Sequence, residues 1–127
     1  MILGTGIDIV EIERIRESIH RYGDRFTRRL FTPEEVAYCR DKAAWAVHFA
    51  GRYAAKEAVM KALQTGWAGG VRWKDVAVTR NERGQPGVQL SGGAHARAQQ
   101  MGITRWHLSI SHSEIHAVAT AIAEGQD

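Results

Sequence analysis

The segment GRYAAKEAVMKAL, residues 51–63, carries an acid and several cations inside a run of strong helix formers. Wound at 100° per residue, Glu57 and Lys61 fall one turn apart on one stripe of the predicted helix. Lys56 falls near the apolar stripe, where a cation has to extend toward solvent or find an anion. One interpretation is a solvated face with a Glu57–Lys61 pair that stabilises the helix by a few tenths of a kcal/mol. The other is a carboxylate and cations that are placed for chemistry.

A second carboxylate stands in the middle of a predicted strand, ILGTGIDIV. If the strand alternates regularly, Asp8 shares a face with Gly4 and Gly6. A carboxylate is unfavourable there unless the strand is an edge whose Asp8 faces water, or a cation compensates the charge. If Asp8 and Glu57 converge, two hard oxygen ligands with open coordination positions suit Mg²⁺ bound to a phosphate ligand. Three cations would then neutralise the phosphates: Arg52, Lys56 and Lys61.

The elements that must position these groups follow from the period of the apolar residues. A first strand leads into a helix marked by Ile12, Ile15 and Ile19, and a second helix starts with Thr32 as N-cap, Pro33 and Glu35. A long helix is expected from about residue 44 to residue 63, ending at Gly66. Strands follow in WKDVAVT, GVQL, WHLSIS and HAVATAIA, with a short helix that stops at Gly102. The order predicts an α+β fold in a single domain over residues 1–127, with a largely antiparallel sheet packed against a long central helix.

Composition limits the class of protein. The 127 residues are 44% apolar and 24% charged, which is enough to bury a core and excludes a disordered chain. No apolar run approaches the length of a membrane span, the N-terminus has no signal-peptide pattern, and the single Cys39 leaves no internal disulfide. These features predict a cytoplasmic protein that does not insert into a membrane. The net charge of +3 favours an anionic partner, which could be nucleic acid, a phosphorylated ligand or an acidic protein.

Three segments, GTGIDIVEIERI, FAGRYAAKEAVMKAL and LSISHS, resemble in order the signature segments of the holo-[acyl-carrier-protein] synthase family. This family comprises the small, single-domain 4'-phosphopantetheinyl transferases. The segments FTPEE, RWKDVAV, NERGQP and LSGGAHARA also have counterparts there, so the resemblance covers nearly the whole chain. The visible departure is Gln64, where a small residue is expected.

The resemblance implies transfer of 4'-phosphopantetheine from coenzyme A to a serine hydroxyl of apo acyl carrier protein, with release of adenosine 3',5'-bisphosphate. It implies Asp8 and Glu57 as Mg²⁺ ligands, Glu57 and Lys61 as catalytic residues, and a homotrimer with the active site at the subunit boundary. The proton acceptor stays open between Glu57 and a metal-bound water. The residues implied at coenzyme A are Arg52, Lys56, Lys61, Gly66, Ser111 and His112.

Six arginines gather between positions 14 and 29. They indicate either a solvated helix face or a surface that steers an acidic carrier protein. With the resemblance taken into account, the residues expected to bind the carrier are Arg14, Arg21 and Arg25.

Other interpretations fit parts of the pattern. An RNA-binding module would explain the basic charge, but the aromatic residues are few and RNA binding gives no reason for Asp8 and Glu57. A silent nucleotide binder, or another Mg²⁺-dependent transferase, also remains open. A Ser–His nucleophile in LSISHS lacks an acidic partner, and a zinc site built from His107, His112 and His116 lacks a nearby cysteine. No nucleic-acid partner is therefore expected.

Overall fold

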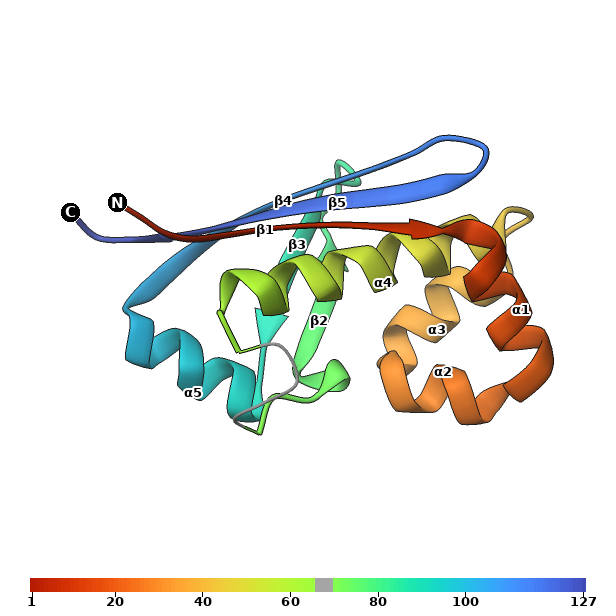
Figure 1. Ribbon diagram of the computed structural model, residues 1–127, viewed down its shortest axis with the longest axis horizontal. Coiled ribbons are helices and arrows are strands. Elements are labelled where there is room, and N and C mark those ends of the chain that lie inside the picture. The colour runs from red at the N-terminus through yellow and green to blue at the C-terminus, as the bar shows by residue number, and fades with distance from the viewer. Residues whose placement is uncertain (66–69) are drawn as a thin grey trace.

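The computed structural model describes residues 1–65 and 70–127. The chain starts with a strand, continues through four helices and ends in a mostly β half (Figure 1). The first half contains β1 (Ile2–Glu11), α1 (Ile12–Tyr22), α2 (Asp24–Leu30), α3 (Pro33–Arg40) and α4 (Trp45–Ala62). The second half contains η1 (Trp73–Asp75), β2 (Val76–Arg80), β3 (Pro86–Leu90), α5 (Gly92–Met101), β4 (Ile103–His112) and β5 (His116–Gly125).

The strands of the described residues form two antiparallel sheets rather than one. The larger has the order β1-β5-β4, and the smaller pairs β2 with β3. Helix α4 lies along β1 and β5, with α1, α2 and α3 grouped near its N-terminal end and α5 toward its C-terminal end (Figure 1). It buries 12 of its 18 residues, which is typical of a helix in the centre of a core. The predicted α+β class and central helix are confirmed, but the strand expected from Trp73 begins only at Val76, after a 3₁₀ turn.

Strand β1 and helix α4 approach each other closely in the core. A Cβ atom on Gly4 would lie 2.3 Å from the carbonyl oxygen of Ala62, and one on Gly6 would lie 1.9 Å from that of Ala58. Backbone therefore packs directly on backbone, and only glycine fits at these two strand positions. Because side chains alternate along a strand, Asp8 also faces the helix. The predicted shared face of Gly4, Gly6 and Asp8 is thus explained by this contact.

The start of α3 is held by a capping box that extends into the core. Thr32 Oγ1 accepts a hydrogen bond from the Glu35 backbone N–H at 3.2 Å, and Glu35 Oε1 accepts one from the Thr32 N–H at 2.8 Å. The other oxygen of Glu35 accepts from the Val78 N–H at 2.7 Å. Glu35 also lies 2.8 Å from the ammonium of Lys56, so this one carboxylate connects α3, α4 and β2.

The end of α4 carries the one non-glycine residue with a positive φ in the described ranges, Gln64 at 64°. It follows the C-cap Leu63, at the position where glycine commonly terminates a helix in the left-handed conformation. The sequence expectation of a small residue there therefore has a backbone reason. Across residues 1–65 and 70–127, none of the helices combines the length and apolar character needed to cross a bilayer.

Candidate active site

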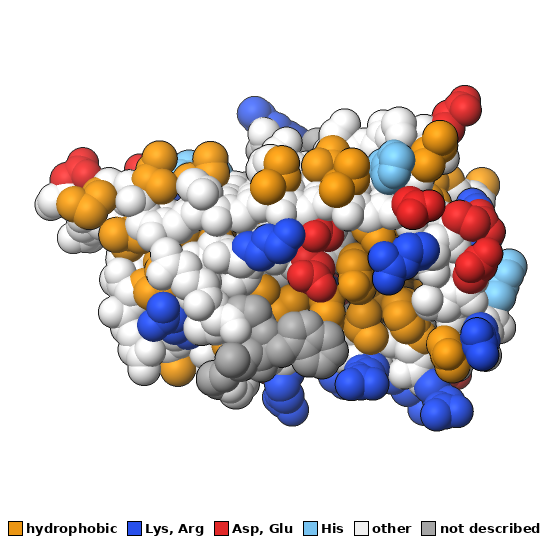
Figure 2. All heavy atoms as spheres, in the orientation of Figure 1, with side chains coloured by type: hydrophobic (Ala, Val, Ile, Leu, Met, Phe, Trp, Pro, Cys, Tyr) orange, Lys and Arg blue, Asp and Glu red, His pale blue; other side chains and the backbone are white. Residues whose placement is uncertain are grey.

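Asp8 and Glu57 come together where β1 passes over α4. Lys61 Nζ donates to Asp8 Oδ1 at 3.1 Å and to the carbonyl oxygen of Ile7 at 2.9 Å. The pKa of Glu57 is raised because the carboxyl is partly buried and because Asp8 lies close to it, while the charge of Lys61 opposes this shift. Lys61 therefore bonds Asp8 rather than Glu57, its partner under the interpretation of a solvated helix face, while its charge still acts on Glu57. Figure 2 shows acidic and basic side chains side by side near the middle of the face of the molecule that it presents.

The donor set fits a hard divalent cation that completes its shell elsewhere. No group of three or more His, Cys, Asp or Glu side chains that could hold a metal occurs in the part of the chain that the structure describes. Mg²⁺ is commonly bound through one or two carboxylates plus waters and substrate phosphates, so it does not need a third protein ligand. The Asp8 side chain is 16% exposed and can be reached from solvent.

Tyr53 is a site residue that the sequence reasoning missed. It lies one turn before Glu57 on α4 and hydrogen-bonds with that carboxylate, which opposes the rise in the pKa of Glu57. The pKa of Tyr53 itself is raised by burial and then by the charges of Glu57 and Asp8. Its ring stacks on Trp73 with the centroids 5.1 Å apart. The four-residue spacing from Glu57 was the signal in the sequence that could have identified it.

Arg52 belongs to a second cationic group, centred on Tyr38. The guanidinium carbon of Arg52 lies 4.2 Å from the Tyr38 ring centroid, with Lys42 Nζ at 4.4 Å and the Arg80 guanidinium at 5.3 Å. Arg52 is 3% exposed, and its Nε is buried without a hydrogen-bond partner among the described residues. Cations gathered on one ring, one of them with an unpaired donor, form an environment suited to an anion.

The two predicted contacts from the fourth strand lie at its end. Ser111 and His112 are both exposed on β4. His112 is close enough to His48 to contribute to the lowered pKa of His48, for which burial and then Arg52 are the larger causes. His112 is therefore in the electrostatic neighbourhood of the cationic group around Tyr38.

Lys56 requires a correction, because a phosphate contact was expected for it. Its side chain is fully buried, and Nζ is held by Glu35, by the Trp73 carbonyl oxygen at 3.1 Å and by the Val76 carbonyl oxygen at 2.5 Å. An ammonium has three N–H groups to donate, and all three have acceptors here. Lys56 is thus a structural residue with no surface to offer a ligand. The remaining expected contact, Gly66, lies outside the described residues.

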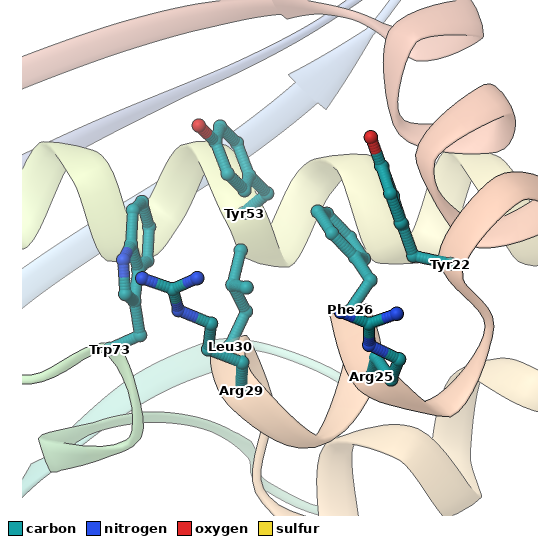
Figure 3. Close-up of a pocket in the computed structure, with 7 residues that line it drawn as sticks. All are labelled: Tyr22, Arg25, Phe26, Arg29, Leu30, Tyr53 and Trp73. Carbon is teal, nitrogen blue, oxygen red and sulfur yellow. The ribbon is translucent and has the colours of Figure 1, made fainter.

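A hollow of about 390 Å³ opens beside Tyr53, between α2, α4 and η1 (Figure 3). Its apolar lining comes from Tyr22, Phe26, Leu30, Tyr53 and Trp73, with Arg25 and Arg29 also contributing to its wall. Figure 3 shows the two guanidinium groups extending over this lining from α2. The hollow therefore combines an apolar floor with positive charge and shares Tyr53 with the carboxylate pair.

The arginines expected to bind a carrier are exposed next to this hollow. Arg14 and Arg21 lie on α1 and Arg25 on α2. Arg14 lowers the otherwise raised pKa of Tyr53, which places its charge near the hollow and Glu57. Lys and Arg side chains gather at the lower right of Figure 2, over the region of α1 and α2 in Figure 1.

The face of the large sheet that points away from α4 exposes large apolar side chains. Ile7 and Ile9 are 61% and 63% exposed on β1, and Ile9 pairs with Val118 of β5. His107 of β4 lies 2.9 Å from Glu124 of β5 across the strands. Exposed isoleucines on an edge strand are typical of a surface that another chain covers.

Comparison with known proteins identifies relatives over the whole chain. Residues 4–122 match the family model described as the 4'-phosphopantetheinyl transferase superfamily. The chain is 54% identical to the holo-[acyl-carrier-protein] synthase of Koribacter versatilis, covering 98% of this chain and 99% of that one. It superimposes on the crystal structure of the Neisseria meningitidis holo-[acyl-carrier-protein] synthase with a TM-score of 0.89 at 33% identity, covering 98% and 99%. The Helicobacter pylori synthase, solved in complex with coenzyme A, gives 0.84 at 32% identity over 94% and 99%.

Proposed function

Because the chain belongs to the 4'-phosphopantetheinyl transferase superfamily, as its sequence resemblance indicated, we propose that it acts as a holo-[acyl-carrier-protein] synthase. It transfers 4'-phosphopantetheine from coenzyme A to a serine hydroxyl of apo acyl carrier protein. The observation that carries this proposal is the meeting of Asp8, Glu57 and Lys61 beside a cationic, partly apolar surface. A solvated helix face would not need a carboxylate of β1 turned inward against α4.

The carboxylate pair is proposed as the Mg²⁺ site. When bound there, Mg²⁺ supplies charge neutralisation for the pyrophosphate of the donor. Asp8 and Glu57 hold it, Tyr53 orients the Glu57 carboxylate, and Lys61 neutralises the pyrophosphate at the reacting end. These residues contribute positioning and electrostatic stabilisation, which are the main requirements of phosphoryl transfer.

The group around Tyr38 is proposed to receive another phosphate of coenzyme A. Arg52 has a buried donor with no hydrogen-bond partner in the described ranges, and Arg80 and Lys42 lie on the same Tyr38 ring. Ser111 and His112 would complete this side from β4. Lys56 is left out of the phosphate-binding set, because its three donors are used in the core.

The carrier is proposed to dock on α1 and α2. Arg14, Arg21 and Arg25 offer positive charge to an acidic carrier, and the neighbouring hollow offers an apolar seat for one of its side chains. Since the hollow shares Tyr53 with the carboxylate pair, a carrier held there would bring its serine toward Glu57. Charge directs the encounter and the apolar contact fixes the register.

The assembly and the setting are proposals of the same kind. The exposed isoleucine face of β1 supports self-association, and we propose a homotrimer. We also propose that the protein acts in the cytoplasm. Each chain contributes one transferase domain over residues 1–127. Size-exclusion chromatography with light scattering tests the number of chains.

The reaction is tested by intact-mass spectrometry of apo acyl carrier protein incubated with this protein, coenzyme A and Mg²⁺. A mass gain of one phosphopantetheine, roughly 340 Da, is expected and should disappear with EDTA. Coenzyme A binding without a mass gain would point to a different acceptor. Absence of both would remove the proposal and favour the RNA-binding alternative, which a labelled RNA titration would then examine.

A further inference from the structure

We infer that Lys61 is the counter-ion of the metal site when the site holds no metal, and that it competes with the divalent cation for Asp8. As a result, the metal and the donor pyrophosphate bind cooperatively: the metal releases the Lys61 ammonium, and the pyrophosphate receives it. This inference rests on the proposed Mg²⁺ site at Asp8 and Glu57.

The contacts of Lys61 carry the inference. Its ammonium bonds Asp8 Oδ1 at 3.1 Å and the Ile7 carbonyl oxygen at 2.9 Å, both on β1. The side chain has crossed from α4 to the strand instead of pairing along its own helix with Glu57. Lys61 nevertheless opposes the raised pKa of Glu57, so its charge acts on both carboxylates.

The charges around Asp8 and Glu57 determine whether Lys61 weakens or strengthens metal binding. Asp8 and Glu57 repel each other, and Lys61 is bonded to Asp8 as its counter-ion. A divalent ion that binds the same carboxylates is repelled by an ammonium at hydrogen-bond distance from one of their oxygens. Lys61 is able to leave, because its side chain is 52% exposed and its stem is flexible.

Moving the Lys61 ammonium away from Asp8 is unfavourable, and an anionic ligand offsets this loss. Once displaced, the ammonium loses the Asp8 carboxylate and the Ile7 carbonyl together. A pyrophosphate next to the metal provides a new acceptor, so donor binding favours the displaced position of Lys61. By linkage, the metal must then strengthen donor binding by the same factor through which the donor strengthens metal binding.

The test measures metal binding directly, with Mn²⁺ as the probe and the electron paramagnetic resonance signal of free Mn²⁺ as the readout. Mn²⁺ takes the same oxygen ligands as Mg²⁺. Without coenzyme A, Lys61→Met should bind Mn²⁺ more tightly than the wild type, because the competing ammonium is gone. An effect of about fivefold or more is expected, which is the lower end of typical coupling between two bound groups. The matched control Lys74→Met removes one exposed lysine that borders a different hollow, beside Asp24 and Arg40, and should bind as the wild type does. Lys61→Arg keeps the charge and should restore weak binding.

A second arm measures the coupling. Coenzyme A should tighten Mn²⁺ binding more in the wild type than in Lys61→Met, because only the wild type has an ammonium to transfer. Equal or weaker Mn²⁺ binding by Lys61→Met without coenzyme A, in a variant whose melting temperature matches the wild type, overturns the inference.

Asp8→Asn separates this inference from the proposed site. If Asp8→Asn loses Mn²⁺ binding while Lys61→Met leaves it unchanged, the metal site stands and the competition is wrong. If Asp8→Asn binds Mn²⁺ as the wild type does, the metal site itself is wrong, and the inference falls with it.

Discussion

The ammonium of Lys56 lies 2.8 Å from Glu35 in the interior, where neither side chain is more than 2% exposed. The same ammonium donates to the carbonyl oxygens of Trp73 and Val76, so it joins α3, α4 and the start of β2. Burial lowers the pKa of Lys56, and Glu35 opposes that shift through its charge and its hydrogen bond. The pair holds in place the helix that presents Glu57 and Lys61, although neither of its members reaches the site.

Removing one partner of this buried pair should destabilise the protein strongly. Lys56→Met removes the cation that compensates the buried Glu35, and a loss of about 3–5 kcal/mol in the free energy of unfolding is expected. Urea denaturation measures it. The double variant with Glu35→Gln should lose less than the sum of the two single variants, whereas additive losses would contradict the coupling. Lys74→Met, on the exposed side of η1, should change stability by no more than about 0.5 kcal/mol.

Neutralising the carboxylate pair should abolish the reaction while preserving the fold. Asp8→Asn and Glu57→Gln should each lower the transfer rate by about 100-fold or more, because each removes a proposed ligand of the cation that would neutralise the transition-state charge. The contact of Asp8 with the half-exposed Lys61 contributes at most about 1 kcal/mol to stability. Rates come from the mass assay and stability from thermal melting. Full activity in either variant would show that the pair does not hold the metal.

Reversing the charge of Arg14 should affect the carrier and spare the donor. Arg14→Glu is expected to raise the KM for acyl carrier protein about tenfold, which corresponds to about 1.4 kcal/mol, with coenzyme A affinity unchanged. The KM should also rise steeply with added salt in the wild type. Arg28→Glu is a control on α2 that does not line the hollow. A loss of coenzyme A affinity in Arg14→Glu would show that α1 is not a docking surface.

The backbone at residue 64 offers a stabilising substitution. Gln64→Gly should raise the free energy of unfolding by about 1 kcal/mol, because a side chain with φ of 64° is strained and glycine is not. Gly102→Ala, at the end of α5 with φ of 80°, is the converse change and should destabilise by a similar amount. Chemical denaturation measures both. A neutral or negative effect of Gln64→Gly would mean that the Gln64 side chain makes a compensating contact.

The thiol of Cys39 should make the free energy of unfolding depend on pH in the alkaline range. Burial raises the pKa of its thiol to about 11, and its side chain is not exposed. Between pH 9 and 11 the folded state keeps this proton while the unfolded chain releases it, so the free energy of unfolding should fall as the pH rises. Iodoacetamide should label the native protein slowly at pH 8 and the urea-unfolded protein quickly. Rapid labelling of the native state would contradict the burial of Cys39.

Much of the fold could be predicted from the sequence, because the decisive patterns are local. The capping box of Thr32 and Glu35 spans four residues, and the faces of β1 follow from simple alternation. The pairing of Asp8 with Glu57 was only a conditional interpretation of the residues, and the family resemblance was what implied it. Even Gln64 was noticed as out of place, and its positive φ explains why.

The functions of the individual cations were decided by tertiary structure. A helical wheel places Lys56 and Lys61 on the same helix, but it does not show that Glu35 buries one or that Asp8 draws the other onto β1. The grouping of Lys42, Arg52 and Arg80 on Tyr38 likewise joins α3, α4 and β2. Periodicity fixes which face a residue occupies, whereas burial and the choice of ion-pair partner depend on contacts between segments far apart in the chain. The sequence by itself therefore determined the elements and marked the two carboxylates as candidates, whereas only packing brought Asp8 and Glu57 together and decided which charges belong to the core and which remain for the site.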